Sequence, residues 1–257
     1  NETLTSELNV DHTIGFTTNA LTSENYGYDE DFTYFESDVE SGLNNKIGNK
    51  LPEGRIYNMA SNMWNIYLNL KYLFDKPDRE FTRAKDIINK LITKINSIDN
   101  SESWFAWIHL MDTHHPYHSE NYSSNTSRQK AYKITKKIVG KNGGSKENEE
   151  LTRKLYLDTV KQLDDDLDIL WNYLNKNDQV ILCGDHGEHL GEKEHWGHNE
   201  YLDNTLLNIP FMTKNITVPE TDVISLIDVP SIIMQKDWKQ GKFGERKYAY
   251  SISETNK

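Results

Sequence analysis

Apolar positions along the chain fall into stretches of helical spacing that alternate with short continuous runs. Helical spacing extends over residues 55–74 and 79–98, separated by Pro77, and again over residues 151–174. Each stretch carries an apolar stripe on one face, which is typical of helices that pack against a core. The pattern therefore predicts a helical pair at 55–98 and a long amphipathic helix in the second half of the chain.

The continuous apolar runs predict strands. Residues 104–110 and 179–183 are nearly all apolar and lead into polar loops, as buried strands do. Residues 209–212 and 247–252 are shorter strand candidates, and residues 223–234 favour a helix. Strands that alternate with helices indicate an α/β layered fold with a largely parallel sheet, in which ligands bind at the carboxyl ends of strands.

A polar excursion at 119–150 interrupts this alternation. It is rich in Ser, Asn and Lys and contains Gly143-Gly144, so we expect a mobile segment or a weak helix with the least order in the chain. A lid that gathers an anionic substrate is one interpretation of its basic residues, but a solvated face is the more common use of such a charge run. These residues are Arg128, Lys130, Lys133, Lys136, Lys137, Lys141 and Lys146.

Composition narrows the class of protein. With 257 residues, 36% hydrophobic and 27% charged, the chain can bury a sizeable core. The net charge of −11 argues against nucleic-acid binding, so any anion site must be local. No apolar run is long enough for a membrane segment, and the polar start is unlike a secretion signal. The single cysteine, Cys183, excludes a disulfide framework, and we expect a cytoplasmic protein.

Candidate chemistry is concentrated directly after the 179–183 run. Four of the nine histidines lie within residues 184–198. A carboxylate beside an imidazole at a strand end is able to ligate a divalent cation, and flanking glycines let the backbone turn beneath it. Asp185 and His186 are therefore the candidate metal ligands. The competing interpretation is that this Asp-His pair only caps a helix.

The order of the blocks around this pair resembles a known family. The sequence has GDHGE at 184–188, LGE at 190–192, WGH at 196–198, LNIPF at 207–211 and, upstream, HLMDTHHPY at 109–117. These blocks resemble those of the sulfatase family of the alkaline phosphatase superfamily. Further resemblance lies in GFTTNA at 15–20, YGYD at 26–29, Tyr156, Asp164 and VISLIDVP at 223–230, so that it covers nearly the whole chain.

The resemblance implies a fold, an activity and a site. The fold is an alkaline-phosphatase-like layered α/β fold, with a mostly parallel central sheet flanked by helices. The activity is metal-dependent hydrolysis of a small anionic sulfate ester. Asp185 and His186 are implied as metal ligands, and His114 and His198 as contacts of the substrate anion or as general acid. The implied cofactor is a divalent metal ion, calcium first, with magnesium, manganese or zinc as alternatives.

Two departures from the family pattern matter. His198 stands where the family often has Lys, and imidazole titrates near neutrality. The family's N-terminal block, with an Asp-Asp metal pair and a nucleophile in a C/S-x-P-x-R motif, has no counterpart in these 257 residues. Cys183 is no substitute, because an apolar strand predicts a buried, inert thiol. We therefore expect residues 1–257 to form a partial catalytic domain, incomplete at its N-terminus.

Several alternatives stay open at this point. The same metal pair serves phosphodiesterases and phosphoglycerol transferases of the superfamily, and a chain without a nucleophile also fits an inert anion-binding remnant. His115 and His118 are candidates for lining the cleft or for plain surface positions. His189 and His195 are candidate partners of the metal ligands. Glu188 either orients His186 or caps the following helix.

Overall fold

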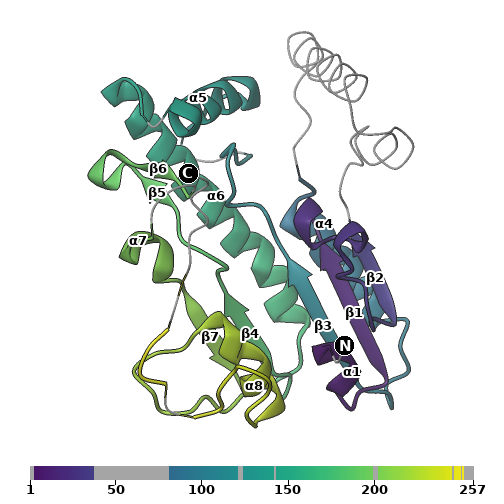
Figure 1. Ribbon diagram of the computed structural model, residues 1–257. Coiled ribbons are helices and arrows are strands. Elements are labelled where there is room, and N and C mark those ends of the chain that lie inside the picture. The colour runs from purple at the N-terminus through teal and green to yellow at the C-terminus, as the bar shows by residue number, and fades with distance from the viewer. Residues whose placement is uncertain are drawn as a thin grey trace, which may run out of the picture. The chain divides into compact units, whose positions relative to one another are not determined.

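The computed structural model describes residues 3–37, 81–120, 124–141, 143–198, 202–244, 246–249 and 251 (Figure 1). The helix predicted at 55–74 lies outside these residues. The chain divides into two compact units, which are described separately. The parallel-sheet unit comprises residues 10–136 and 154–170, and the histidine-loop unit comprises residues 1–9, 137–153 and 171–257.

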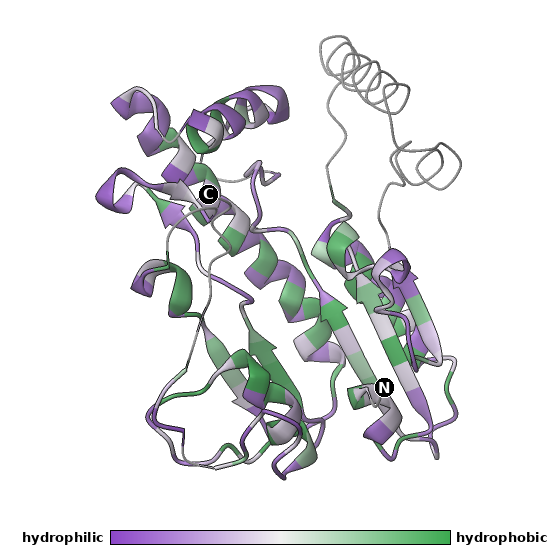
Figure 2. Cartoon of the chain, in the orientation of Figure 1, coloured by the Kyte–Doolittle hydropathy of each residue, from purple (hydrophilic) through white to green (hydrophobic). Residues whose placement is uncertain are grey.

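Three parallel strands organise the parallel-sheet unit. Strand β1 (His12–Thr17) lies between β2 (Tyr34–Ser37) and β3 (Trp104–His109), and both neighbours pair with it in parallel. Hydrophobic residues run along β1 and β3 (Figure 2), and Ile14 and Phe16 of β1 are fully buried. A parallel sheet with helical cover confirms the predicted α/β fold class.

Helix α4 (Ala84–Ile95) packs on one face of this sheet. Its buried residues recur at helical spacing, and they are Ala84, Ile87, Ile88, Leu91 and Ile95. Lys90 pairs with Glu36 of β2 at 2.7 Å, and Lys94 lies over the Tyr34 ring at 4.4 Å. The Asp112 carboxylate accepts the first helical N–H, from Ala84, at 3.0 and 3.2 Å. A residue in the loop after β3 thus caps the helix that covers the sheet.

Two further helices lie in the middle of the chain, where a mobile segment or a weak helix was expected. The polar excursion contains α5 (Arg128–Lys141) and the start of α6 (Lys146–Tyr173), so most of it is ordered helix. In α5, Ala131, Thr135 and Ile138 are buried at helical spacing among the lysines. The lysines obscured this stripe because they dominate the composition of the segment.

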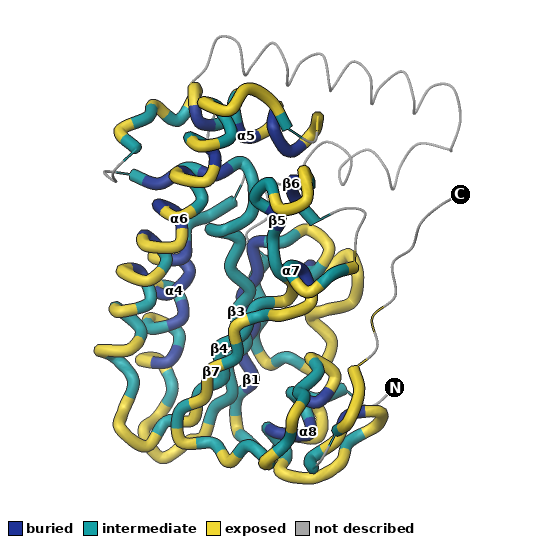
Figure 3. The backbone as a smooth tube through the Cα atoms, turned by 90° about the vertical axis from the view of Figure 1, so that its left-hand side faces the viewer, coloured by how far each residue is buried: buried dark blue, intermediate teal, exposed yellow. Residues whose placement is uncertain are grey.

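Helix α6 confirms the predicted long helix but with a different buried face. Of the apolar stripe predicted within residues 151–174, Leu155 is buried, but Val160 and Trp171 are 40% and 38% exposed. The side of α6 that is buried (Figure 3) is largely polar, and its side chains bond to neighbouring segments. Asp166 accepts two hydrogen bonds from Arg83, and Gln162 accepts the Glu120 N–H at 2.7 Å. Because these groups are paired, they are buried without the cost of unsatisfied polar atoms.

The histidine-loop unit contains short antiparallel pairs. Strand β4 (Val180–Cys183) pairs with β7 (Phe211–Lys214), and β5 (His189–Leu190) pairs with β6 (Trp196–Gly197). Strand β7 begins two residues later than predicted. The helix predicted at 223–234 is a 3₁₀ turn, η4 (Leu226–Asp228), continued by α8 (Val229–Met234).

Three strand predictions were wrong in detail. Residues 247–249 and 251 form no strand, and the preceding Arg246 N–H donates to the Thr221 hydroxyl. Strands β3 and β4 are half-buried along their whole length, not buried. Among the described strands β3 is at the edge of its sheet and β4 has one partner, so neither is enclosed on both sides.

The remaining elements are short. They are α1 (Leu4–Glu7), α7 (Asn204–Leu207), η1 (Ala20–Thr22), η2 (Glu24–Tyr26) and η3 (Glu192–Glu194). Within the described ranges, no helix combines the length and the apolar character needed to cross a bilayer.

Candidate functional site

Both histidine-rich loops follow the carboxyl ends of strands, as predicted. The loop after β3 carries His114, and the loop after β4 carries Asp185, His186 and His198. The first loop belongs to the parallel-sheet unit and the second to the histidine-loop unit. Three of the four predicted site residues are therefore brought together, and His114 is described through its own surroundings.

Asp185 and His186 form the exposed end of the β4 loop. The His186 Nε2 lies 3.8 Å from the Asp185 Oδ2, and the two side chains are 40% and 59% exposed. The His186 Nδ1 lies 2.8 Å from the Gly187 carbonyl oxygen. Since a carbonyl only accepts, Nδ1 is the donor of this bond. The arrangement orients the other ring nitrogen toward the carboxylate.

This pair has the donor chemistry of a cation site. A histidine that ligates a metal typically donates its other ring N–H to a carbonyl or carboxylate, as His186 does. A carboxylate oxygen and an imidazole nitrogen suit a divalent cation. Among the described residues, however, no group of three or more His, Cys, Asp or Glu side chains is arranged to hold a metal. The pair therefore fits as two ligands of an incomplete set.

A small hairpin places His198 beside this pair. Strands β5 and β6 pair His189 with Gly197 and Leu190 with Trp196. Just beyond this ladder, the His198 Nδ1 lies 3.2 Å from both carboxylate oxygens of Glu188. The His198 ring packs against the His186 ring, with centroids 4.2 Å apart. The hairpin thus brings the third predicted residue to the candidate metal ligands.

The electrostatics of His198 favour its charged form. Its hydrogen bond with Glu188 is the main cause that raises the pKa of His198 above the usual value. Burial opposes this effect, while the negative charges of Glu188 and Asp185 add to it. A positively charged imidazole beside the candidate metal ligands is suited to an anion.

His189 anchors the hairpin and is buried. Its Nδ1 lies 3.2 Å from the Gly197 carbonyl oxygen and its Nε2 lies 3.1 Å from the Asp203 carboxylate. A hydrogen bond from Lys193 is the main cause that lowers the pKa of Asp203 to about 2. The His195 ring meets His189 edge to face at 5.5 Å. These contacts make His189 a support of the loop.

Gly187 lets the loop lie against α7. Its N–H donates to the Leu206 carbonyl at 2.8 Å. A Cβ at this position would lie 2.0 Å from the Thr205 carbonyl oxygen. Since that obstacle is backbone, no other residue fits without moving α7 or the loop. The glycine between His186 and Glu188 is thereby explained.

His114 is held within its own loop. Its Nδ1 donates to the His115 carbonyl at 2.6 Å, and its ring stacks on His115 at 4.4 Å. Phe81 meets the His114 ring edge to face at 5.5 Å. In the next part of the loop, Tyr117 is fully buried against Tyr156. The loop is therefore anchored at Tyr117, which follows these two histidines in the chain.

Cys183 is half-buried, not buried as expected. Burial raises the pKa of its thiol, and the charge of Asp185 adds to the shift. Both effects disfavour the thiolate, so the interpretation that Cys183 is no nucleophile agrees with its surroundings.

Comparison with known protein families gives the identity. A protein-family model described as Sulfatase matches residues 3–222, which is most of the chain. The chain belongs to the sulfatase family. A search of curated proteins finds no match. Membership of the sulfatase family supports a hydrolase in general. The family is generally metal-dependent and acts on sulfate esters.

The sulfatase loop also contains a contact that the sequence prediction missed. Glu188 was expected to orient His186 or to cap a helix, but its hydrogen-bond partner is His198. The element that follows it is β5 rather than a helix. The two strands that bring Glu188 and His198 together, residues 189–190 and 196–197, are too short to leave a periodic signal in the sequence.

Proposed function

We propose that this chain supplies the metal-binding and anion-binding part of a sulfatase that hydrolyses sulfate esters. The observation that carries the proposal is the grouping of Asp185, His186 and His198 at the end of β4 in a chain of the sulfatase family. The site residues proposed are Asp185 and His186 for the metal, and His114 and His198 for the substrate anion.

Asp185 and His186 would hold a divalent cation through a carboxylate oxygen and the His186 Nε2. When bound, such an ion supplies Lewis-acid polarisation of the sulfate group. Calcium is proposed first, on the family resemblance. A carboxylate suits calcium or magnesium, whereas an imidazole ligand also suits manganese or zinc. Within the part of the chain that the structure describes, no third His, Cys, Asp or Glu completes the set.

His198 and His114 would contact the oxygens of the ester. A chain of net charge −11 offers no general attraction for an anion, so positive charge must be local. The raised pKa of His198 supports this role, because the charged ring donates a hydrogen bond and stabilises negative charge that develops on a sulfate oxygen. His114 is assigned to the anion by the position of its motif alone.

No residue of this chain is proposed as the nucleophile. A C/S-x-P-x-R motif is absent from the 257 residues. The second candidate is a phosphodiesterase or phosphoglycerol transferase of the superfamily, which shares the Asp-His metal pair, or an inert anion-binding remnant. We further propose that residues 1–257 belong to one partial catalytic domain, and that the protein is cytoplasmic, on the basis of its single cysteine.

Hydrolysis by the purified gene product tests the proposal. We expect cleavage of an aryl sulfate that needs a divalent cation and is lost in Asp185→Asn, while Asp222→Asn, an exposed control, retains it. Faster cleavage of an aryl phosphodiester than of the sulfate would favour the second candidate. If neither ester is cleaved with any of the cations tested, the anion-binding remnant is the candidate function that remains.

A further inference from the structure

The β5–β6 hairpin sets a carboxylate opposite an imidazole. His189 pairs with Gly197 and Leu190 with Trp196 in antiparallel register. The next positions in the same register are Glu188 and His198. Residues opposite each other in an antiparallel pair have Cβ atoms about 4.5 to 5.5 Å apart, close enough for these side chains to meet. Their contact therefore follows from the hairpin register.

The contact determines which nitrogen of His198 carries a proton. Both Glu188 oxygens lie 3.2 Å from Nδ1, and the Glu188 side chain is only 6% exposed. An ionised carboxylate accepts hydrogen bonds and donates none. Nδ1 must therefore be the donor, whether the ring is neutral or charged. A substrate oxygen can then be met only by the Nε2 of His198.

Glu188 has little freedom to leave this position. A Cβ on Gly197 would lie 2.9 Å from the Val139 side chain, so the hairpin passes close to Val139. On the other strand, Arg153 donates to the Leu190 carbonyl at 2.7 Å and stacks over the Trp196 ring at 5.0 Å. The buried His189 bonds to Gly197 and Asp203. The carboxylate is thus held on a hairpin that is fastened on several sides.

We propose that Glu188 is a positioning residue, which holds His198 with Nδ1 as donor and so reserves Nε2 for an oxygen of the sulfate or phosphate ester. The inference rests on the proposed function for the identity of the ester, but the orientation of His198 does not depend on it. Carboxylates that orient metal-binding histidines in other proteins contribute roughly 10- to 100-fold to metal affinity or activity, and we expect an effect of that order here. Glu188 would act through His198 and not touch the substrate.

Nitrogen NMR of the His198 ring tests the orientation directly. The chain is labelled with ¹⁵N-histidine, kept with a chelator at a pH where the ring is neutral, and assigned by the loss of one signal in His198→Gln. Glu188→Leu removes both acceptor oxygens at similar volume. Glu194→Leu is the matched control, because Glu194 is an exposed carboxylate of the same loop and its removal changes the charge equally.

The expected result is an Nδ1–H tautomer in the wild type and in Glu194→Leu, and a shift toward Nε2–H in Glu188→Leu. We also expect hydrolysis by the gene product to fall roughly tenfold or more in Glu188→Leu only. An Nε2–H tautomer in the wild type, a result that needs no variant to fold, would overturn the inference. So would an unchanged tautomer in Glu188→Leu.

The two proposals fail separately. If the tautomer shifts as expected but the gene product cleaves neither sulfate nor phosphate esters, the orienting contact stands and the proposed function is wrong. If hydrolysis is observed and is equal in Glu188→Leu and Glu194→Leu, the proposed function stands and Glu188 does not position His198 for it.

Discussion

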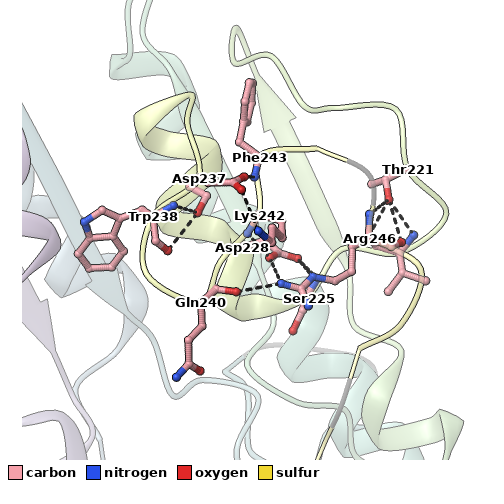
Figure 4. Close-up of polar contacts among 11 residues, drawn as sticks. Thr221, Ser225, Asp228, Asp237, Trp238, Gln240, Lys242, Phe243 and Arg246 are labelled. Atoms are coloured by element: carbon pink, nitrogen blue, oxygen red, sulfur yellow. Dashed lines mark hydrogen bonds and ion pairs between the residues drawn. The ribbon is translucent and has the colours of Figure 1, made fainter.

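Two aspartates of the histidine-loop unit show opposite uses of the same side chain. The Asp228 side chain is 4% exposed and accepts hydrogen bonds from the Arg246 guanidinium and from the backbone of Ser225 and Lys242 (Figure 4). The Asp185 side chain is 59% exposed and faces the Nε2 of His186. Asp185 lies within residues 3–222, which the sulfatase model matches, and Asp228 lies just beyond them.

The difference in exposure between the two carboxylates separates a stabilising role from a ligand-binding role. A buried carboxylate whose acceptor positions are filled by protein donors closes a loop and has no room for a ligand. An exposed carboxylate contributes little to folding and is accessible to a cation or substrate. Asp228 therefore belongs to the structure, and Asp185 to the candidate site. The predictions below test this division.

The largest expected effect is the loss of Asp228. In Asp228→Ala the Arg246 guanidinium loses its carboxylate partner, and breaking a buried ion pair in this way costs about 3 to 5 kcal/mol. Urea denaturation at neutral pH measures the free energy of unfolding. A loss below about 1 kcal/mol, the value of an exposed pair, would show that Asp228 does not hold the loop.

Removal of the charged ring at His198 comes next. His198→Gln keeps an amide donor for Glu188 but loses the positive charge. Removing a hydrogen-bond donor that stabilises a developing anion lowers the rate about 10²- to 10³-fold. We expect kcat/KM of the gene product for an aryl sulfate to fall to that extent. A fall in unfolding free energy similar to that of Asp228→Ala would instead assign His198 to the structure.

Lowering the pH tests the stabilising role of Asp228 in a second way. Burial favours the neutral carboxyl, but the hydrogen bonds from Arg246, Ser225 and Lys242 outweigh it, and the pKa of Asp228 is lowered. A lowered pKa contributes stability that is complete above the unfolded value of about 3.9 and is lost as the pH falls through the folded value. The stability difference between wild type and Asp228→Ala should shrink below about pH 4, as measured by urea denaturation. A difference that grows there would contradict the assignment.

The smallest effect is expected at Asp185 without metal. Because the side chain is exposed, Asp185→Ala should change the free energy of unfolding by no more than about 0.5 kcal/mol. Urea denaturation in the presence of a chelator measures it, with Asp222→Ala as the exposed control. A loss of several kcal/mol would mean that Asp185 is a structural residue like Asp228.

The sequence predicted the elements in which apolar residues follow a regular pattern. Helix α4 and strands β3 and β4 carry uniform apolar patterns, and they were located to within a few residues. The buried face of α6 was wrong because Gln162 and Asp166 are buried through bonds to distant segments. Strands β1 and β2 were not predicted. Thr and Gly interrupt the apolar residues of β1, and Tyr34 and Phe35 are the only apolar residues of the four-residue β2.

The site was predicted at the level of its loops but not of its contacts. The carboxyl end of β4 indicated where Asp185 and His186 lie, because chain order alone determines that a loop follows a strand. The pairing of Glu188 with His198 depends on strands of two residues, which carry no periodic signal. The ion pair of Asp228 with Arg246 joins residues 18 positions apart, and no local sequence pattern specifies it.

Calcium binding tests the central claim most directly, that Asp185 and His186 hold a divalent cation. Thermal unfolding of the gene product is followed with and without calcium, then with magnesium, manganese and zinc, for wild type, Asp185→Asn and Asp222→Asn. A ligand that binds the folded state at 100 times its Kd stabilises it by about 2.7 kcal/mol. We predict cation-dependent stabilisation of the wild type and of Asp222→Asn that is absent from Asp185→Asn. Equal stabilisation of all three proteins, or of none with any of the four ions, would contradict the claim.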